Sequence, residues 1–315
     1  MSAAALLNVT VVVLSYRRPE ELSRALPIIT AQAEECNRDP RIDASVLIVD
    51  NDPAGSAEET VRKCDSPLVR YVIEPTPGIA AARNRGLLEA RRPGLLVFID
   101  DDEAPMDNWL RPLLETWRQT QAAAVMGKVI SQFEQEPDPW IIAGDFFWRP
   151  TRVTGTPVRV AAAGNLLLDL RQVDALGLSF DDRYGLSGGE DTLFSKQLIQ
   201  RGGSIVWCEE SKAIDFVPLS RSTRGWVIGR SRSAGNTTST IDIQLASSGR
   251  ARFLAHSAAL AAGCGRVVGG SLRCAAGLVT RSLRHQARGL RTVNRGIGMI
   301  AAGVGIRFQE YARDD

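Results

Sequence analysis

The sequence predicts an α/β protein built on a mostly parallel, doubly wound, Rossmann-like sheet. Short apolar segments rich in β-branched residues alternate with segments of helical spacing over most of the chain. The most apolar of these strands, residues 95–99, is followed directly by four acids, residues 100–103. Ligands of such sheets bind outside the carboxyl ends of the strands. We therefore expect the acidic strand end to be the centre of the functional site.

The other elements are expected in chain order. Residues 9–15 form a run of apolar residues that predicts the first strand, and Pro19, with acids after it, predicts the start of a helix. Further strands are expected over residues 46–50, 70–74, 95–102, 123–130 and 204–208. Helices are expected over residues 79–90, 108–120 and 190–201. A turn rich in proline and glycine, residues 75–78, precedes the Ala-rich helix.

Composition describes an ordinary globular protein with 315 residues, of which 44% are hydrophobic and 23% charged. This length is enough for one large or two small domains. The five cysteines show no Cys-x-x-Cys spacing, which argues against a disulfide framework or a zinc site and favours a reducing compartment. The N-terminus lacks the pattern of a signal peptide, and no run reaches the roughly 18 apolar residues of a spanning helix. We expect a cytoplasmic protein.

Residues 131–156 interrupt the regular pattern with proline, tryptophan and phenylalanine. Such a loop-rich aromatic segment can form a flap that lines a binding site. It can equally be a lid that only fills core. The sequence leaves both alternatives open.

The last part of the chain is strongly basic. Between Asp242 and Glu310 there are ten arginines, no lysine and no acid. The rest of the chain is left with 28 basic and 36 acidic residues, a net charge of −8. Five of these arginines recur every three or four residues and so share one helical face: Arg281, Arg284, Arg288, Arg291 and Arg295. We expect a helical basic region that binds an anionic membrane surface, with packing on the acidic body as the alternative.

The Ser-, Thr-, Gly- and Asn-rich residues 231–240 suggest a boundary between a first domain, residues 1–230, and this basic region, residues 231–315. The chain has only two histidines, His256 and His285, and both lie in the basic region. A histidine-based catalytic triad in the first domain is therefore excluded. No aromatic residues are interleaved with the arginines in the way that nucleic-acid binding would require, so no nucleic-acid partner is expected.

Two acidic clusters carry the expected chemistry. Four consecutive acids at a buried strand end repel one another unless a cation offsets them, and carboxylates suit Mg²⁺ or Mn²⁺. The alternative for this cluster is a solvated acidic turn. The second cluster, Glu190 and Asp191, follows two glycines at a helix start. There the acids complement the helix dipole, but the glycines also leave room for a substrate.

Five motifs, in this order, resemble those of the family 2 inverting glycosyltransferases of the GT-A fold. They read V-V-V-L-S-Y-R-R-P, V-D-N-D-P, P-G-I-A-A-A-R-N-R-G, F-I-D-D-D-E and G-G-E-D, and the resemblance extends from Val9 to about Arg230. The fourth motif, together with V-P-L-S-R-S-T-R-G-W, is most similar to the succinoglycan-type bacterial exopolysaccharide transferases. The resemblance departs at Asn51, where a second Asp is more usual, and near Asp215, where many relatives have a histidine.

This resemblance implies a metal-dependent inverting transfer of a sugar from a nucleotide-sugar, by default a UDP-sugar, to a saccharide or lipid-linked acceptor. It implies that the donor contacts Ser15, Tyr16, Arg18, Asp50, Asn51, Gly78, Arg83, Asp100, Asp101 and Asn165. Asp100 and Asp102 would hold Mn²⁺ or Mg²⁺. Asp191 would be the catalytic base, and Glu190 would orient acceptor or phosphate groups. A lipid-linked acceptor would place the enzyme at the inner face of the cell membrane, as a peripheral protein.

Three other functions are compatible with parts of the sequence, but other residues argue against each of them. A nucleotidyltransferase would carry a Gly-rich loop after the first strand, and residues 15–19 lack the glycines. A phosphatase with an aspartate nucleophile would carry a threonine where Glu103 and Ala104 stand. A non-catalytic sugar-binding or scaffolding subunit would not need both acidic clusters.

Overall fold

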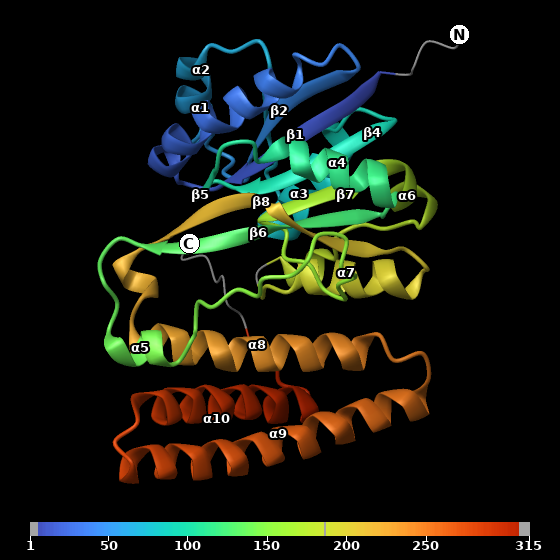
Figure 1. Cartoon of the computed structure of the whole chain (residues 1–315). Coiled ribbons are helices and arrows are strands. Elements are labelled where there is room, and N and C mark those ends of the chain that lie inside the picture. The colour runs from blue at the N-terminus through green and yellow to red at the C-terminus, as the bar shows by residue number, and fades with distance from the viewer. Residues whose placement is uncertain (1–5, 186, 309–315) are drawn as a thin grey trace. The chain divides into compact units, whose positions relative to one another are not determined.

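The structure is a computed structural model that describes residues 6–185 and 187–308. Within these residues eight strands form one sheet in the order β3-β2-β1-β4-β7-β6-β8-β5 (Figure 1). The strands are β1 Leu7–Ser15, β2 Ile42–Asp50, β3 Val69–Ile73, β4 Gly94–Asp100, β5 Glu103–Pro105, β6 Ala124–Phe133, β7 Asn165–Asp169 and β8 Ile205–Val217. The α-helices are α1 Pro19–Cys36, α2 Glu58–Cys64, α3 Ile79–Glu89, α4 Leu110–Thr120, α5 Pro139–Ala143, α6 Leu170–Ala175, α7 Glu190–Gln200, α8 Arg224–Gln244, α9 Gly249–Val279 and α10 Leu283–Gly303.

The expected α/β class is confirmed. Strands β3, β2, β1 and β4 are parallel neighbours, as strands separated by helices should be. Beyond β4 the sheet continues with antiparallel pairs, because β7 runs against both β4 and β6. The last pair, β5 with β8, is also antiparallel. The parallel block therefore supplies the edge of carboxyl strand ends at which α/β sheets bind ligands, and the antiparallel strands widen the sheet.

Both faces of the sheet are buried, which explains the continuous apolar runs in the sequence. Val11 packs in a core with residues of α1 and α4, whereas its neighbour Val12 packs in a second core with residues of α3, α6 and α7. Successive residues of a strand point to opposite faces, so one valine-rich strand serves both cores. The helices of the two cores hold the parallel strands in register.

By their contacts, the described residues fall into two compact units. The first comprises residues 6–130, 149–185 and 190–215, and the second comprises residues 131–148, 187–189 and 216–308. The first unit holds most of the sheet, and the second is dominated by α8, α9 and α10. Among the residues that the structure describes, no helix has both the length and the apolar composition that a membrane span requires.

Residues 231–240, whose composition suggested a domain boundary, lie inside α8. Its small residues serve helix packing. A Cβ on Gly235 would lie 2.1 Å from the carbonyl oxygen of Arg295, so the backbones of α8 and α10 touch at a distance that only glycine permits. Asn236 is buried there and donates to the carbonyl oxygen of Gly298 at 3.2 Å. The composition of these residues is typical of a loop, but in the structure they form a close helix–helix contact.

The basic region is helical as expected, but it forms two helices after α8 instead of one continuous stripe. The chain turns between α9 and α10 at Arg281, which has a left-handed φ of 53°. Glycine is again the means of close packing, because a Cβ on Gly270 of α9 would lie 2.8 Å from the carbonyl oxygen of Gly289 of α10. Because of this turn, α9 and α10 pack side by side, and arginines of the two helices lie close together.

The aromatic segment fills core, which was one of the two alternatives. Trp140 of α5 is buried in a cluster with Val227 and Ala287 in the second unit. Asp138 caps this short helix by accepting a hydrogen bond from the backbone N–H of Trp140 at 2.8 Å. Trp148, by contrast, is 69% exposed. This segment therefore anchors the helical unit and leaves one indole ring at its surface.

Candidate active site

The carboxyl ends of the three central parallel strands bring the first expected residues together. In the sheet register Ser15 at the end of β1 is opposite Asp50 at the end of β2, and Leu14 is opposite Asp100 at the end of β4. Residues that are far apart in sequence thus meet at one edge, as expected for a parallel sheet. All the site residues described below belong to the first unit.

Asp50 and Asn51 shape the loops at this edge. The carboxylate of Asp50 accepts hydrogen bonds from the backbone N–H of Ala57 at 2.7 Å and from the hydroxyl of Tyr71 at 2.9 Å. Asn51 donates to the carbonyl oxygen of Thr76 at 2.7 Å and accepts from the N–H of Gly78 at 3.0 Å. These bonds tie the loop after β2 to the turn before α3, so the V-D-N-D-P motif builds the wall of the site.

Helix α3 starts at the site with a glycine that the structure requires. Gly78 has a φ of 122°, and a Cβ there would lie 3.1 Å from the Cα of Gly185. One turn later, Arg83 is buried and forms an ion pair with the equally buried Glu190 of α7. The guanidinium of Arg83 also lies 5.6 Å from the centre of the Phe180 ring. Two of the predicted residues are thereby brought into contact across 107 positions of sequence.

Burial and mutual repulsion dominate the acids that follow β4. Desolvation raises the pKa of Asp100 to about 6, and repulsion from Asp102 and Asp191 adds to this, while Arg83 opposes it. Desolvation also raises the pKa of Glu103 well above its usual range, and the Asp100 carboxylate adds to the shift. A Cβ on Gly164 would lie 2.7 Å from Glu103 Oε1 and 3.0 Å from Asp100 Oδ2, so both carboxylates face this glycine.

A single arginine partly neutralises the next two acids. Arg18 Nη1 donates to Asp101 Oδ1 at 3.2 Å and to Asp102 Oδ2 at 3.0 Å. Desolvation raises the pKa of the buried Asp101 to about 7 in spite of this contact. Beside them, the guanidinium of Arg17 lies 5.1 Å from the ring centre of Tyr16. Arg18 is therefore placed as predicted, at the acidic edge, with its charge directed at carboxylates.

Asp191 lies at the start of α7, where it is partly exposed and its carboxylate accepts a hydrogen bond from the hydroxyl of Thr192 at 3.2 Å. It is close enough to Asp100 for the two charges to interact. The neighbouring Glu190 is buried, and desolvation raises its pKa against the opposing effect of Arg83. The two acids of this pair thus have different environments: one is accessible and the other is held by a buried cation.

Asn165 is the predicted residue whose surroundings favour a structural role. Its amide oxygen accepts from Trp109 Nε1 at 3.0 Å, and its amide nitrogen donates to the carbonyl oxygens of Lys128 and Ser211 at 3.2 and 3.3 Å. The amide group uses its donors and its acceptor on protein partners. These contacts join β7 to β6, to β8 and to the start of α4, and they leave nothing for a ligand to bind.

Comparison with known proteins decides the family. Residues 10–165 match glycosyl transferase family 2. Over 234 residues the chain is 33% identical to the succinoglycan biosynthesis protein ExoM of Rhizobium meliloti (strain 1021), an alignment that covers 73% of this chain and 74% of ExoM. The chain belongs to glycosyl transferase family 2. It is thus a glycosyltransferase, and the expected family is confirmed.

Solved structures of similar fold agree with this family. The structure of GalNAc-T7 with UDP, GalNAc and Mn²⁺ has a TM-score of 0.53 at 15% identity, covering 75% of this chain and 50% of that one. The structure of S. aureus TarS has a TM-score of 0.51 at 13% identity, covering 78% of this chain and 41% of that one. This glycosyltransferase thus spans half or less of their length. At these identities the likeness concerns the fold, and it supports the expected GT-A class.

The donor set at the acidic edge fits a divalent metal of the kind that carboxylates hold. Glu103 Oε2 is buried and has no hydrogen-bond partner among the described residues, and the carboxylates of Asp100 and Glu103 both lie against Gly164. Among the described residues, no three His, Cys, Asp or Glu side chains form a ready-made metal cage. Mg²⁺ in phosphate-handling enzymes is held by one or two carboxylates together with substrate phosphates, so such a cage is not required.

Two contributors to this site were not among the predicted site residues. Gly164 precedes β7 and makes room for the carboxylates of Asp100 and Glu103. Asp215 of β8 is opposite Glu103 in the sheet register, and its charge adds to the raised pKa of Asp100. In the sequence, Asp215 was noted only because many relatives have a histidine near this position. For Gly164 no local signal exists, because the atoms that it would meet come from another strand.

Proposed function

We propose that this glycosyltransferase moves a sugar from a nucleotide-sugar, a UDP-sugar, to a saccharide or lipid-linked saccharide, with inversion and with Mn²⁺ or Mg²⁺. One observation carries the proposal: the buried ion pair between Arg83 of α3 and Glu190 of α7 brings the start of α7, and with it Asp191, to the acidic edge, where the charges of Arg83 and Asp191 both affect the pKa of Asp100. One carboxylate is suited to the donor's metal and the other to the acceptor's proton. The two motifs are far apart in the sequence, and the fold brings them close together.

The donor side of the site is assigned to the edge of the parallel block. Asp100 and Asp102 would hold the metal, which when bound offsets the charge of the leaving nucleoside diphosphate. Asp50 and Asn51 shape the loops against which the nucleoside would bind, through their bonds to Ala57 and Gly78. Arg18, Ser15, Tyr16 and Asp101 complete that wall. Glu103 is buried beside Asp100, and desolvation together with the Asp100 charge raises its pKa, so without a cation its neutral form is favoured.

The transfer itself requires one base. Asp191 accepts the proton of the acceptor hydroxyl while that oxygen forms a bond to the anomeric carbon. The bond from that carbon to the diphosphate breaks, and the nucleoside diphosphate leaves with the electron pair. Attack from the side opposite the leaving group inverts the anomeric centre. Arg83, through its ion pair with Glu190, positions the start of α7 and therefore Asp191.

The test is release of nucleoside diphosphate from a panel of nucleotide-sugars, with Mn²⁺, with Mg²⁺ and with EDTA. We expect release from UDP-sugars with either metal and none with EDTA, and an inverted anomeric signal in the product by NMR. Release of inorganic diphosphate instead would indicate nucleotidyl transfer. Equal turnover in EDTA would contradict the metal assignment.

We further propose that the protein associates peripherally with an anionic membrane surface on its cytoplasmic side. Helix α9 carries exposed apolar side chains at intervals along its length, namely Phe253, Leu254, Val268, Leu272, Leu278 and Val279. The span around it contains no acid. An apolar face with flanking arginines is the pattern of an interfacial helix. Co-sedimentation with vesicles that contain phosphatidylglycerol tests this, and equal binding to purely zwitterionic vesicles would contradict the role of charge.

A further inference from the structure

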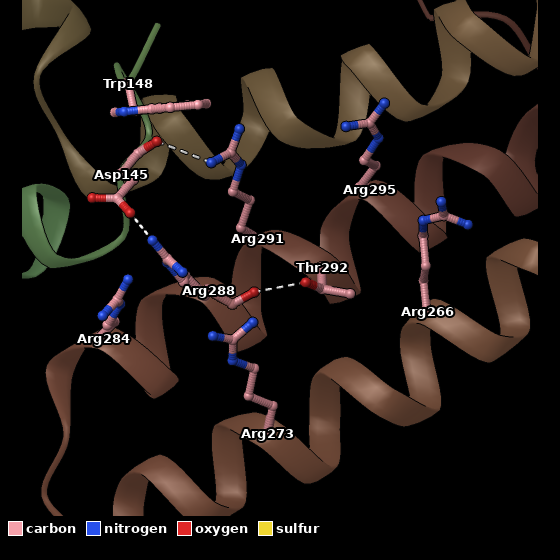
Figure 2. Close-up of a pocket in the computed structure, with 9 residues that line it drawn as sticks. All are labelled: Asp145, Trp148, Arg266, Arg273, Arg284, Arg288, Arg291, Thr292 and Arg295. Atoms are coloured by element: carbon pink, nitrogen blue, oxygen red, sulfur yellow. Dashed lines mark hydrogen bonds and ion pairs between the residues drawn. The ribbon is translucent and has the colours of Figure 1, made fainter. Parts of the chain in front are cut away.

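A pocket of about 600 Å³ lies in the helical unit, among α9, α10 and the segment after α5 (Figure 2). Its volume is in the usual range for small-molecule sites. Six arginines line it: Arg266 and Arg273 from α9, and Arg284, Arg288, Arg291 and Arg295 from α10. Four of these were predicted to share a helical face, and the structure turns that face into the wall of a pocket.

One acid faces these six cations. The carboxylate of Asp145 forms an ion pair with Arg288, and its backbone carbonyl accepts from Arg291 Nη1 at 3.0 Å (Figure 2). The side chains of Arg284 and Arg295 have neither a hydrogen bond nor an ion pair with any residue that the structure describes. Partial burial and the nearby guanidinium groups of Arg295 and Arg288 lower the pKa of Arg291. The pocket therefore concentrates positive charge that the second unit itself does not neutralise.

Guanidinium groups are planar forks that bind phosphate oxygens in pairs, and several converging forks suit a ligand with more than one phosphate. Apolar surface adjoins the charge. Trp148 lines the pocket and is 69% exposed, so its indole ring offers apolar surface beside the arginines. A ligand that combines an anionic group with an apolar part would use both surfaces.

We propose that this pocket binds the diphosphate group of a lipid-linked acceptor. Two or three negative charges of a diphosphate would be shared among the arginines, Arg284 and Arg295 foremost, and the lipid would leave the pocket beside Trp148. The identification of the ligand as the acceptor rests on the proposed function, whereas diphosphate binding itself does not.

The first experiment is calorimetric titration of the full-length protein with inorganic diphosphate, in EDTA and without donor. We expect binding to the wild type and at least about tenfold weaker binding to the Arg284→Gln/Arg295→Gln variant, because two charge-assisted contacts are lost. The matched control, Arg250→Gln/Arg252→Gln, removes the same charge from exposed positions of α9 outside the pocket and should bind like the wild type. Absence of binding, or equal weakening in both variants, overturns the proposal.

A second variant covers the case in which the glutamine variant does not fold. Arg284→Lys/Arg295→Lys keeps the charge and removes the fork geometry, so we expect diphosphate binding weakened severalfold. Wild-type affinity in the lysine variant would mean simple attraction to net charge and would overturn a built site. Melting temperatures of all variants without ligand identify any that are destabilised.

The source of the diphosphate is decided by comparing farnesyl diphosphate with inorganic diphosphate. We expect tighter binding of the farnesyl compound to the wild type and loss of that advantage in Trp148→Ala. Equal affinities would retain the diphosphate site and overturn its assignment to a lipid-linked acceptor. Nucleoside diphosphate release, measured in parallel without acceptor, separates the two hypotheses: a protein that hydrolyses donor but ignores diphosphate contradicts only the pocket, and the reverse contradicts only the proposed donor chemistry.

Discussion

The acidic edge of the sheet and the arginine pocket of the helical unit each contain a cluster of charges of one sign. The two clusters differ in how many opposite charges the protein places beside them. At the edge, two arginines are directed at the acids, since Arg18 contacts Asp101 and Asp102 while Arg83 pairs with Glu190. In the pocket one acid, Asp145, faces six arginines. The negative charge at the edge is thus partly compensated by these two arginines, and under the proposed function a divalent cation would compensate the rest. The pocket has room for an anion that supplies several charges.

The largest expected effect comes from removing a proposed metal ligand at the acidic edge. Asp102→Asn should leave the protein folded and reduce transfer by about 10³-fold or more, because several kcal/mol of stabilisation of the leaving group depend on the bound cation. Steady-state rates in Mn²⁺ measure this, and circular dichroism checks the fold. Asp107→Asn, an exposed change of the same kind nearby, is the control and should be silent. Near-normal metal-dependent turnover in Asp102→Asn would show that the metal is held elsewhere.

The second prediction separates the two acids at the start of α7. Asp191→Asn should lower turnover by about 10²-fold or more, the scale of a lost general base, with donor affinity unchanged. Donor binding by calorimetry and rates with acceptor distinguish the two effects. If donor affinity falls by the same factor, Asp191 is a structural helix-start residue and the base must be sought among the other acids.

The third prediction concerns the buried pair of Arg83 and Glu190. Arg83→Met should lower the free energy of unfolding by about 3–5 kcal/mol, because the buried Glu190 loses its cation. Arg83→Met/Glu190→Leu should recover most of this stability, since neither charge then remains buried. Urea denaturation of both variants measures the difference. A double variant as unstable as the single one would show that packing, and not charge, is what Arg83 contributes.

The smallest effect compares a thiol in each unit. Cys264 is exposed on α9, whereas Cys36 is buried in the first unit, where desolvation raises the pKa of its thiol to about 11. Since the thiolate is the reactive form, Cys264 should react with a thiol reagent at pH 8 and Cys36 should react only on unfolding. Anionic vesicles should slow the Cys264 reaction severalfold if α9 faces the membrane. An unchanged rate would place the membrane contact away from this face.

Much of the first unit was predictable because its signals are local. The strand pattern and the acids after Ile99 predicted the parallel edge, and Gly78 predicted the turn into α3. The ion pair between Arg83 and Glu190 joins two motifs that the sequence had marked separately. The sequence could not show that the side-chain amide of Asn165 is fully hydrogen-bonded, because its partners come from distant elements: Trp109 before α4, Lys128 of β6 and Ser211 of β8.

In the second unit the sequence by itself determined less. Periodicity showed that Arg284, Arg288, Arg291 and Arg295 share a helical face, and composition showed that no acid lies near them in the chain. Only the tertiary structure decided that the face lines a pocket and that residues 231–240 are helix. The physical reason is that the spacing of residues along a helix fixes which side chains share a face. What that face packs against depends on close backbone contacts between helices that are distant in the sequence. Glycines permit these contacts, but no local sequence pattern predicts them.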